Sequence, residues 1–200
     1  MRVGPTLDRL LKEYPDDVRI VYKQHPLSMH RQAPLAAQAV LAAHAQGKYF
    51  EMHEKLFQNI RTLSRQKMIQ VAGEIGLDID RFQKDLDSQE IKAIVARETR
   101  EAVAVGATGT PASFINGRYL SGAQPYKAFK TLVDEELKWA AEGNRPEFTI
   151  GKNVSEVRAK STARRRGPDP AKVYNIPPGA AAFAGPKNAK VTILHYLDYQ

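Results

Sequence analysis

The segment 109–120, Gly-Thr-Pro-Ala-Ser-Phe-Ile-Asn-Gly-Arg-Tyr-Leu, constrains the fold of this chain more than any other stretch. Its Asn116-Gly117 pair lies between two short apolar runs. This is a strong hairpin signal, because a type I′ turn needs positive φ at both central residues. The turn predicts three cross-strand pairs: Ile115 with Arg118, Phe114 with Tyr119, and Ser113 with Leu120. Pro111 opens the first strand, where a missing N–H does least harm to a sheet. After the flexible Gly109, the Thr110-Pro111 bond is a candidate cis bond, with an ordinary trans bond as the alternative.

The 200 residues include no cysteine. The chain as given therefore offers no disulfide, no thiolate nucleophile and no cysteine metal site. Its length suits one domain with appendages, or one domain and a fragment of another. No apolar run approaches the ~20 residues that span a bilayer, and the N-terminus does not resemble a signal peptide. We therefore expect no membrane partner.

The net charge is +8, and the sequence isoelectric point is about 9.6. Much of this excess lies between residues 152 and 172, where Arg164, Arg165 and Arg166 are consecutive. A run of this kind is typical of a solvated linker. The alternative is a basic surface for nucleic acid. We expect the linker and no nucleic-acid partner.

The remaining pattern is one of helices between a few strands. β-branched residues predict a strand over 18–24, and a second strand is expected after residue 190. Ser88 is placed to cap a helix, and Phe50 is expected in the apolar core with Leu56 and Phe57. Helices are expected over residues 6–14, 33–46, 48–59, 64–74, 80–86, 88–105 and 124–141, and a Pro/Gly-punctuated linker over 143–175.

Two stretches resemble one known family. Residues 105–118 followed by 122–125 resemble the cis-proline hairpin of the DsbA-like branch of the thioredoxin fold, and residues 46–57 resemble its helical insertion. The likeness covers about residues 2–142. The fold that the resemblance implies is an α/β, thioredoxin-like fold with a helical insertion.

The last segment resembles the first strand of the same family, which runs directly into a Cys-x-x-Cys motif. Here the sequence stops before the expected first cysteine and resumes after the second, so the C-terminal strand is expected to supply the family's first strand. The expected domains are 2–142 (thioredoxin-like), 143–175 (basic linker) and 176–200 (strand segment). Two histories fit: a circular permutant, or a slice of a tandem array. The strand then completes its own sheet or, in a strand-swapped homodimer, a neighbour's. The residues expected to flank the absent motif are Tyr199, Gln200, Arg2, Val3, Gly4 and Pro5.

The resemblance implies a thiol–disulfide oxidoreductase that acts through a mixed disulfide. It also implies that an extended peptide lies against Thr110 and Pro111. Without cysteines, the chain as given is expected to be redox-inactive. A peptide- or partner-binding module without redox chemistry is the alternative. Family members are mostly periplasmic or otherwise extracytoplasmic.

No residue of the chain is assigned a catalytic role, and no cofactor or metal is expected. His44 and His53 lie on neighbouring predicted helices, but exposed or capping histidines are favoured over a metal site. His195 lies in the last strand, at a position where the family often carries an acid. We expect His195 to be half-buried and to have no catalytic role.

Overall fold

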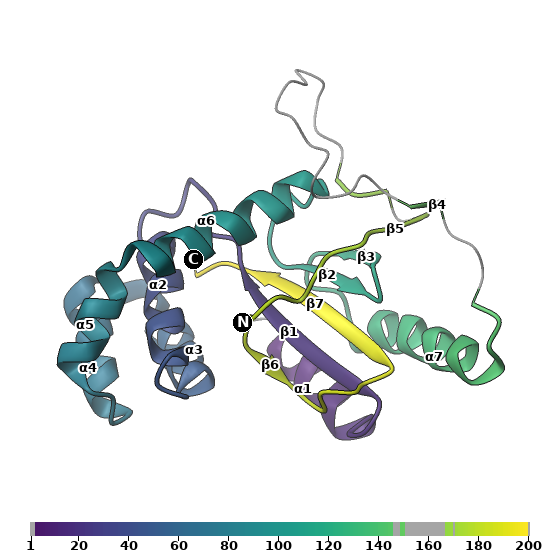
Figure 1. The fold of residues 1–200 in the computed structure, drawn as a ribbon, viewed down its shortest axis with the longest axis horizontal. Helices are drawn as coiled ribbons and strands as arrows, with labels where there is room; N and C mark the ends of the chain where they lie inside the picture. The colour runs from purple at the N-terminus through teal and green to yellow at the C-terminus, as the bar shows by residue number, and fades with distance from the viewer. Residues whose placement is uncertain (1–2, 146–148, 151–166, 170, 200) are drawn as a thin grey trace, which may run out of the picture. The chain divides into compact units, whose positions relative to one another are not determined.

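The computed structural model describes residues 3–145, 149–150, 167–169 and 171–199. The basic run Arg164–Arg166 and most of the predicted linker lie outside these residues. The chain divides into two compact units. The first comprises residues 1–23 and 101–196, and the second comprises residues 24–100 and 197–200. Figure 1 shows the elements of both units.

The first unit is built on a seven-stranded sheet in the order β4-β5-β3-β2-β7-β1-β6. The long strands β1 (Val18–Gln24) and β7 (Val191–Leu197) lie side by side in it (Figure 1). The strands β2 (Ala112–Ile115) and β3 (Arg118–Ser121) form the hairpin. Three two-residue strands complete the sheet: β4 (Thr149–Ile150), β5 (Lys172–Val173) and β6 (Phe183–Ala184). The segment Val191–Leu197, near the end of the given sequence, thus supplies an inner strand to the sheet of its own chain.

The hairpin has the predicted register. Ile115 faces Arg118, Phe114 faces Tyr119 and Ser113 faces Leu120, and the ladder extends to Ala112 and Ser121. Asn116 and Gly117 both have positive φ, of 44° and 86°, as a type I′ turn requires. On its other side β2 pairs antiparallel with β7, from Ala112 opposite Tyr196 to Ile115 opposite Ile193.

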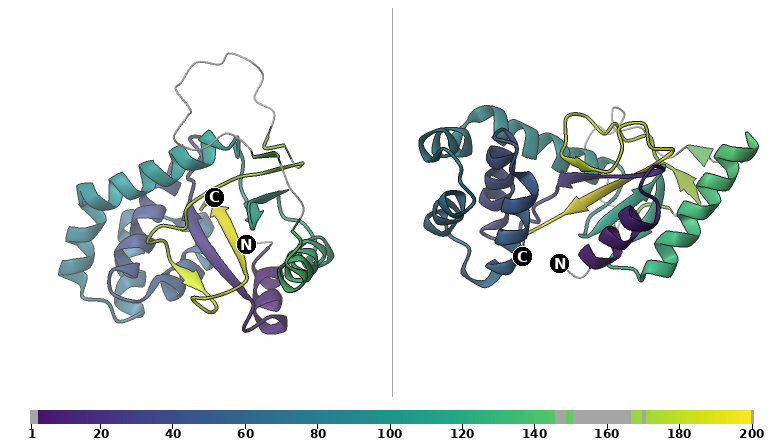
Figure 2. Two further views of the ribbon diagram at one scale, coloured as in Figure 1. Left: turned by 45° about the vertical axis from the view of Figure 1, so that its right-hand side comes forward. Right: turned by 90° about the horizontal axis from the view of Figure 1, so that it is seen from below.

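The two faces of this sheet are covered differently. One face carries α1 (Gly4–Glu13), which packs against α7 (Tyr126–Glu142). The other face is covered by the end of α6 (Gln89–Ala104) and by the segment between β5 and β6. Figure 2 shows α1 and the β5–β6 segment on opposite sides of the sheet. The core of the second face comprises Val21, Ala102, Val105, Ala107, Ala112, Phe114, Tyr174, Ile176, Leu194 and Tyr196.

A buried ion pair joins three of these elements. Lys23, at the end of β1, is 2% exposed, and its Nζ lies 2.6 Å from Oε2 of Glu101 on α6. The same ammonium group donates to the carbonyl oxygen of Pro177, also at 2.6 Å. A buried charge is costly unless it is paired and hydrogen-bonded, and both conditions hold here.

The second unit is helical. It contains α2 (Ala33–His44), α3 (Tyr49–Gln58), η1 (Ile60–Thr62), α4 (Arg65–Glu74), α5 (Ile79–Asp87) and most of α6. The alanine-rich α2 contacts α3, α4 and α5, because its small side chains allow close approach. Hydroxyl and carboxyl caps set the helix starts: Ser64 accepts from the N–H of Lys67, and Asp78 from that of Arg81. Ser88 Oγ accepts from the N–H of Ile91, as predicted.

Two expectations from the sequence need correction. Phe50 is 39% exposed, because the buried side of α3 is set by Tyr49, Met52 and Leu56, and Phe50 lies off that stripe. His195 is fully buried instead of half-buried, because its strand has sheet neighbours on both edges and a covered face on either side. Two short strands, β4 and β5, also lie within the range predicted to be a linker.

Candidate functional site

The Thr110-Pro111 segment lies between α6 and the first residue of β2, and its peptide bond is cis. Ala112, the next residue, pairs with Tyr196, so the segment lies at the end of the sheet where β7 finishes. The Pro111 carbonyl accepts a 3.0 Å hydrogen bond from the N–H of Gly122, which ties the segment to the hairpin. Within the described residues, the main-chain N–H and C=O of Thr110 make no hydrogen bond, and its Oγ1 is buried without a partner. Unused main-chain groups beside a strand can pair with an extended peptide.

Val3, Gly4 and Pro5 form the start of α1. Val3 is 1% exposed, and its carbonyl accepts hydrogen bonds from Thr6 at 3.0 Å and Leu7 at 3.1 Å. No side chain caps this helix, and proline is in its first turn, where its missing N–H costs nothing. Among the described residues, no hydrogen bond or ion pair joins these three to Thr110 or Pro111.

Tyr199 belongs to the second unit and is 2% exposed. Its hydroxyl lies 2.8 Å from Nδ1 of His53, and its ring centroid lies 4.8 Å from that of Phe57. Burial lowers the pKa of His53 to about 4, so this imidazole is neutral at pH 7. The preceding Asp198 is paired with Nδ1 of His30. Arg2 and Gln200, the other two predicted flanking residues, lie outside the described residues.

The histidines take part in packing and hydrogen bonding. His44 meets the ring of Tyr49 edge-on, with centroids 5.8 Å apart, and His53 stacks on the same ring at 5.8 Å. In the first unit, Nδ1 of His195 lies 2.9 Å from Oγ of Ser113. Across residues 3–145, 149–150, 167–169 and 171–199, no group of three or more His, Asp or Glu side chains could hold a metal ion.

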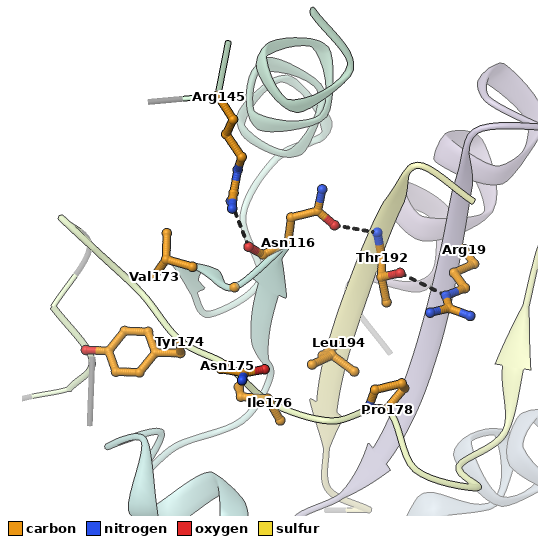
Figure 3. A pocket seen from close by; sticks show the side chains of 11 residues that line it. Arg19, Asn116, Arg145, Val173, Tyr174, Asn175, Ile176, Pro178, Thr192 and Leu194 are labelled. Atoms are coloured by element: carbon orange, nitrogen blue, oxygen red, sulfur yellow. Dashed lines mark hydrogen bonds between the residues drawn. The ribbon is translucent and has the colours of Figure 1, made fainter. Parts of the chain in front are cut away.

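A pocket of about 510 Å³ lies at the other end of the hairpin strands, near the Asn116-Gly117 turn (Figure 3). All its walls belong to the first unit. Its lining residues are Arg19, Asn116, Gly117, Arg145, Val173, Tyr174, Asn175, Ile176, Pro178, Thr192 and Leu194. The sequence did not predict this site, because its parts come from five separate stretches of the chain.

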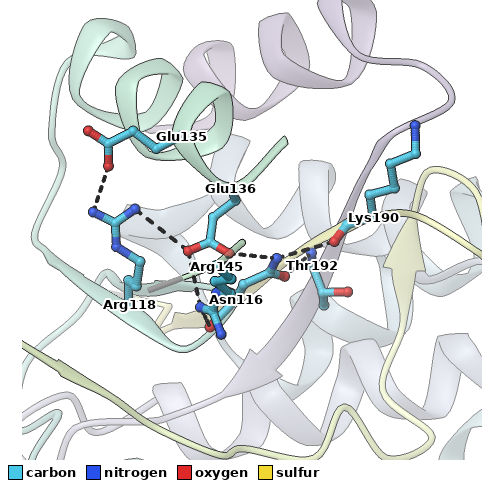
Figure 4. A network of polar contacts seen from close by, with 7 residues as sticks. All are labelled: Asn116, Arg118, Glu135, Glu136, Arg145, Lys190 and Thr192. Atoms are coloured by element: carbon cyan, nitrogen blue, oxygen red, sulfur yellow. Dashed lines mark hydrogen bonds and ion pairs between the residues drawn. The ribbon is translucent and has the colours of Figure 1, made fainter. Parts of the chain in front are cut away.

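The turn beside this pocket is fixed by Glu136 of α7 (Figure 4). The side chain of Glu136 is 1% exposed. Its Oε2 accepts from Arg145 Nε at 2.9 Å and Asn116 Nδ2 at 3.1 Å. Its Oε1 accepts from Arg145 Nη2 at 3.0 Å and lies 3.6 Å from Arg118 Nη1. Sequence reasoning missed this residue. The sequence did hold a signal that Glu136 is buried: it lies seven residues after Phe129 and three after Val133, both on the buried face of α7.

Comparison with known proteins assigns the fold to a family. The profile described as "DSBA-like thioredoxin domain" matches residues 2–134. The curated relatives include a protein named Na(+)/H(+) antiporter NhaA from Herminiimonas arsenicoxydans, 39% identical over 127 residues. That match covers 64% of this chain and 20% of the antiporter. Proteins named Na(+)/H(+) antiporter NhaA 3 from Salinispora tropica and NhaA 1 from Salinispora arenicola are 32% and 31% identical over 130 residues. Each match covers 64% of the chain and 20% of the relative.

The chain thus spans about a fifth of the length of these relatives. No solved structure matches it. In the part of the chain that the structure describes, none of the helices combines the length and the apolar character needed to cross a membrane.

Proposed function

Because the chain belongs to the DSBA-like thioredoxin domain family, we propose that it is the peptide-holding domain of a thiol–disulfide oxidoreductase. The observation that carries this proposal is the unused main chain of Thr110 at the end of the sheet where β7 finishes. Residues 1–200 contain no cysteine and are therefore redox-inactive by themselves. Cation transport is not part of the proposal, since the similarity covers one fifth of each antiporter.

The proposed binding mode is strand addition. An extended peptide aligns with the Thr110-Pro111 segment, its N–H and C=O groups pairing with the C=O and N–H of Thr110. Such recognition depends on main-chain atoms, so it accepts many sequences, as a general disulfide exchanger needs.

The chemistry of the whole oxidoreductase would be dithiol exchange. A thiolate attacks one sulfur of the peptide's disulfide, a mixed disulfide forms, and the peptide's other sulfur leaves as a thiolate. The second thiol of the pair then attacks the mixed disulfide, which releases the reduced peptide and leaves the pair oxidised to a disulfide. We propose that the thiols belong beside the residues predicted to flank them, namely Tyr199 and Gln200 on one side and Arg2 to Pro5 on the other. The contribution of residues 1–200 is to hold the peptide.

Peptide binding tests this proposal directly. A labelled peptide should bind the chain, and N-methylation of the one peptide amide that pairs with Thr110 should weaken binding about tenfold or more, since it removes one hydrogen bond and adds a clash. The matched control is N-methylation of the next residue, whose N–H points to the other side of an extended chain. Equal tolerance of methyl groups at every position would contradict strand addition at this segment.

Insulin reduction separates the oxidoreductase from a binding module without redox chemistry. The cysteine-free chain should give no turnover. A variant extended after Gln200 by Cys-Ala-Ala-Cys should reduce insulin in the presence of dithiothreitol faster than its Ser-Ala-Ala-Ser counterpart. Peptide binding with no gain from the added thiols would favour the alternative, a module that holds peptides only. Turnover by the unextended chain would refute both readings.

A further inference from the structure

The pocket beside the Asn116-Gly117 turn has a lining suited to one kind of ligand. Two guanidinium groups, those of Arg19 and Arg145, line it, and no carboxylate is among its lining residues (Figure 3). Arg145 is balanced by Glu136, at 2.9 Å. Arg19 has no acidic partner among the described residues. The pocket therefore carries a positive charge that a bound anion would neutralise.

Arg19 is held in place with one nitrogen unused. Its Nε donates to Oγ1 of Thr192 at 2.8 Å, and its Nη1 donates to the carbonyl of Lys187 at 2.9 Å. Its Nη2 makes no hydrogen bond to the part of the chain that the structure describes. The fixed guanidinium group is pre-organised, so little side-chain entropy remains to be lost when a ligand binds.

The rest of the lining combines apolar and polar side chains. Val173, Ile176 and Leu194 present aliphatic surface, while Asn116 and Asn175 present amides. The volume of about 510 Å³ is in the range of small-molecule sites. A ligand that fits has a carboxylate at one end and an apolar body at the other.

The pocket is separate from the proposed peptide site. Thr110 precedes β2 and Asn116 follows it, so the two lie at opposite ends of that strand, roughly 20 Å apart at 3.3 Å per residue. Occupation of one site therefore leaves the other open.

We propose that this pocket binds an organic carboxylate with an apolar body, the carboxylate against Arg19 and the apolar part against Val173, Ile176 and Leu194. Two sources share this chemistry: a free organic acid, and the C-terminal carboxylate of a peptide that ends in an apolar residue. The site goes beyond the proposed disulfide chemistry and needs no thiol.

The test is titration of the full chain with N-acetyl-L-phenylalanine. Binding is measured by calorimetry and by the amide chemical shifts of Tyr174, Thr192 and Leu194. The neutral control ligand is N-acetyl-L-phenylalaninamide. We expect saturable binding of the acid, shifts at these three amides, and at least tenfold weaker binding of the amide. A heptapeptide that ends in Phe, with a free or an amidated C-terminus, distinguishes the two sources. If the heptapeptide with the free C-terminus binds more tightly than N-acetyl-L-phenylalanine, the natural ligand class is peptide C-termini. If it binds more weakly, the ligand class is free organic acids.

Variants locate the site. Arg19→Gln should weaken binding at least tenfold, and Arg19→Lys, which keeps the charge but loses the fork, should have a smaller effect. Arg9→Gln is the matched control, because Arg9 stacks on the ring of Tyr126 and does not line the pocket. Thermal melts verify that each variant is folded. Equal binding of acid and amide, unchanged affinity in both Arg19 variants, or inorganic phosphate binding as tightly as the acid would overturn the proposal.

Discussion

The side chain of Glu136 offers a quantitative test of the first unit. In Glu136→Gln the volume stays the same, but one carboxylate oxygen becomes an NH₂ group. In the unsubstituted protein each carboxylate oxygen of Glu136 faces two donors. Oε2 faces Arg145 and Asn116, and Oε1 faces Arg145 and Arg118. Either orientation of the amide therefore places a donor against donors and removes the negative charge that the two guanidinium groups share, although Arg118 keeps its pair with Glu135.

The magnitude follows from burial. Breaking a fully buried pair costs about 3–5 kcal/mol. Here the glutamate side chain is 1% exposed, but Arg118 and Arg145 are 16% and 39% exposed, so water compensates part of the loss. We expect the free energy of unfolding to fall by about 2–4 kcal/mol. The neighbouring Glu135→Gln is the matched control. Glu135 is 42% exposed and, within the described residues, its one ion pair is with Arg118 at 2.8 Å, so its loss should cost about 1 kcal/mol or less.

The assay is urea unfolding followed by tryptophan fluorescence. The chain has a single tryptophan, Trp139, which lies on α7 in the first unit, so the signal reports on that unit. The midpoint should move to lower urea for Glu136→Gln with an unchanged slope. Equal losses for Glu136→Gln and Glu135→Gln would refute the reasoning, because the buried network would then contribute no more than a surface ion pair.

Three further outcomes are expected. Gly117→Ala should lower the free energy of unfolding by at least about 2 kcal/mol, because φ is +86° and the added Cβ would lie 2.5 Å from a main-chain oxygen. Gly122→Ala, where φ is +72° but the space around the Cβ is open, should lower it by about 1 kcal/mol. Urea midpoints compare the two variants. The pKa of His53 is about 4 in the folded chain against 6.5 for an ordinary histidine, so the unfolded state takes up the proton first as the pH falls. Stability should therefore drop by roughly 2–3 kcal/mol from pH 6.5 to pH 4, a loss that His53→Phe should remove in unfolding curves followed by circular dichroism. Lys23→Met should destabilise the first unit by about 3 kcal/mol, because it breaks the pair with Glu101. Adding Glu101→Leu should restore most of that loss. If the double variant shows no recovery, the loss does not come from the ion pair.

Local signals in the sequence predicted the local structure. The Asn116-Gly117 turn fixed the hairpin register, since a type I′ turn allows a single pairing of the flanking residues. Ser88 marked the start of α6, and Gly143, in the left-handed region with φ 66°, marked the end of α7. The strand over 18–24 was predicted with its observed bounds.

Features made by distant residues were not predicted. The three two-residue strands are too short for any period to show, and they are defined by their pairing with neighbouring strands: β6 with β1, β5 with β3, and β4 with β5. Glu136 looks like a surface residue in sequence, because its partners Asn116, Arg118 and Arg145 are brought to it by tertiary structure. The pocket was not predicted for the same reason, because residues that are distant in the sequence form its lining.

The placement of β7 has a consequence for biosynthesis. Arg19 on β1 and Thr192 on β7, which are hydrogen-bonded neighbours, are 173 positions apart in the chain. At the usual elongation rate of about 5–20 residues per second, the ribosome needs roughly 10–35 s to make the partner of β1 after β1 itself. Throughout that interval the nascent sheet lacks its middle, and its apolar faces are open to chaperones. High contact order also predicts slow closure once the last strand emerges from the exit tunnel.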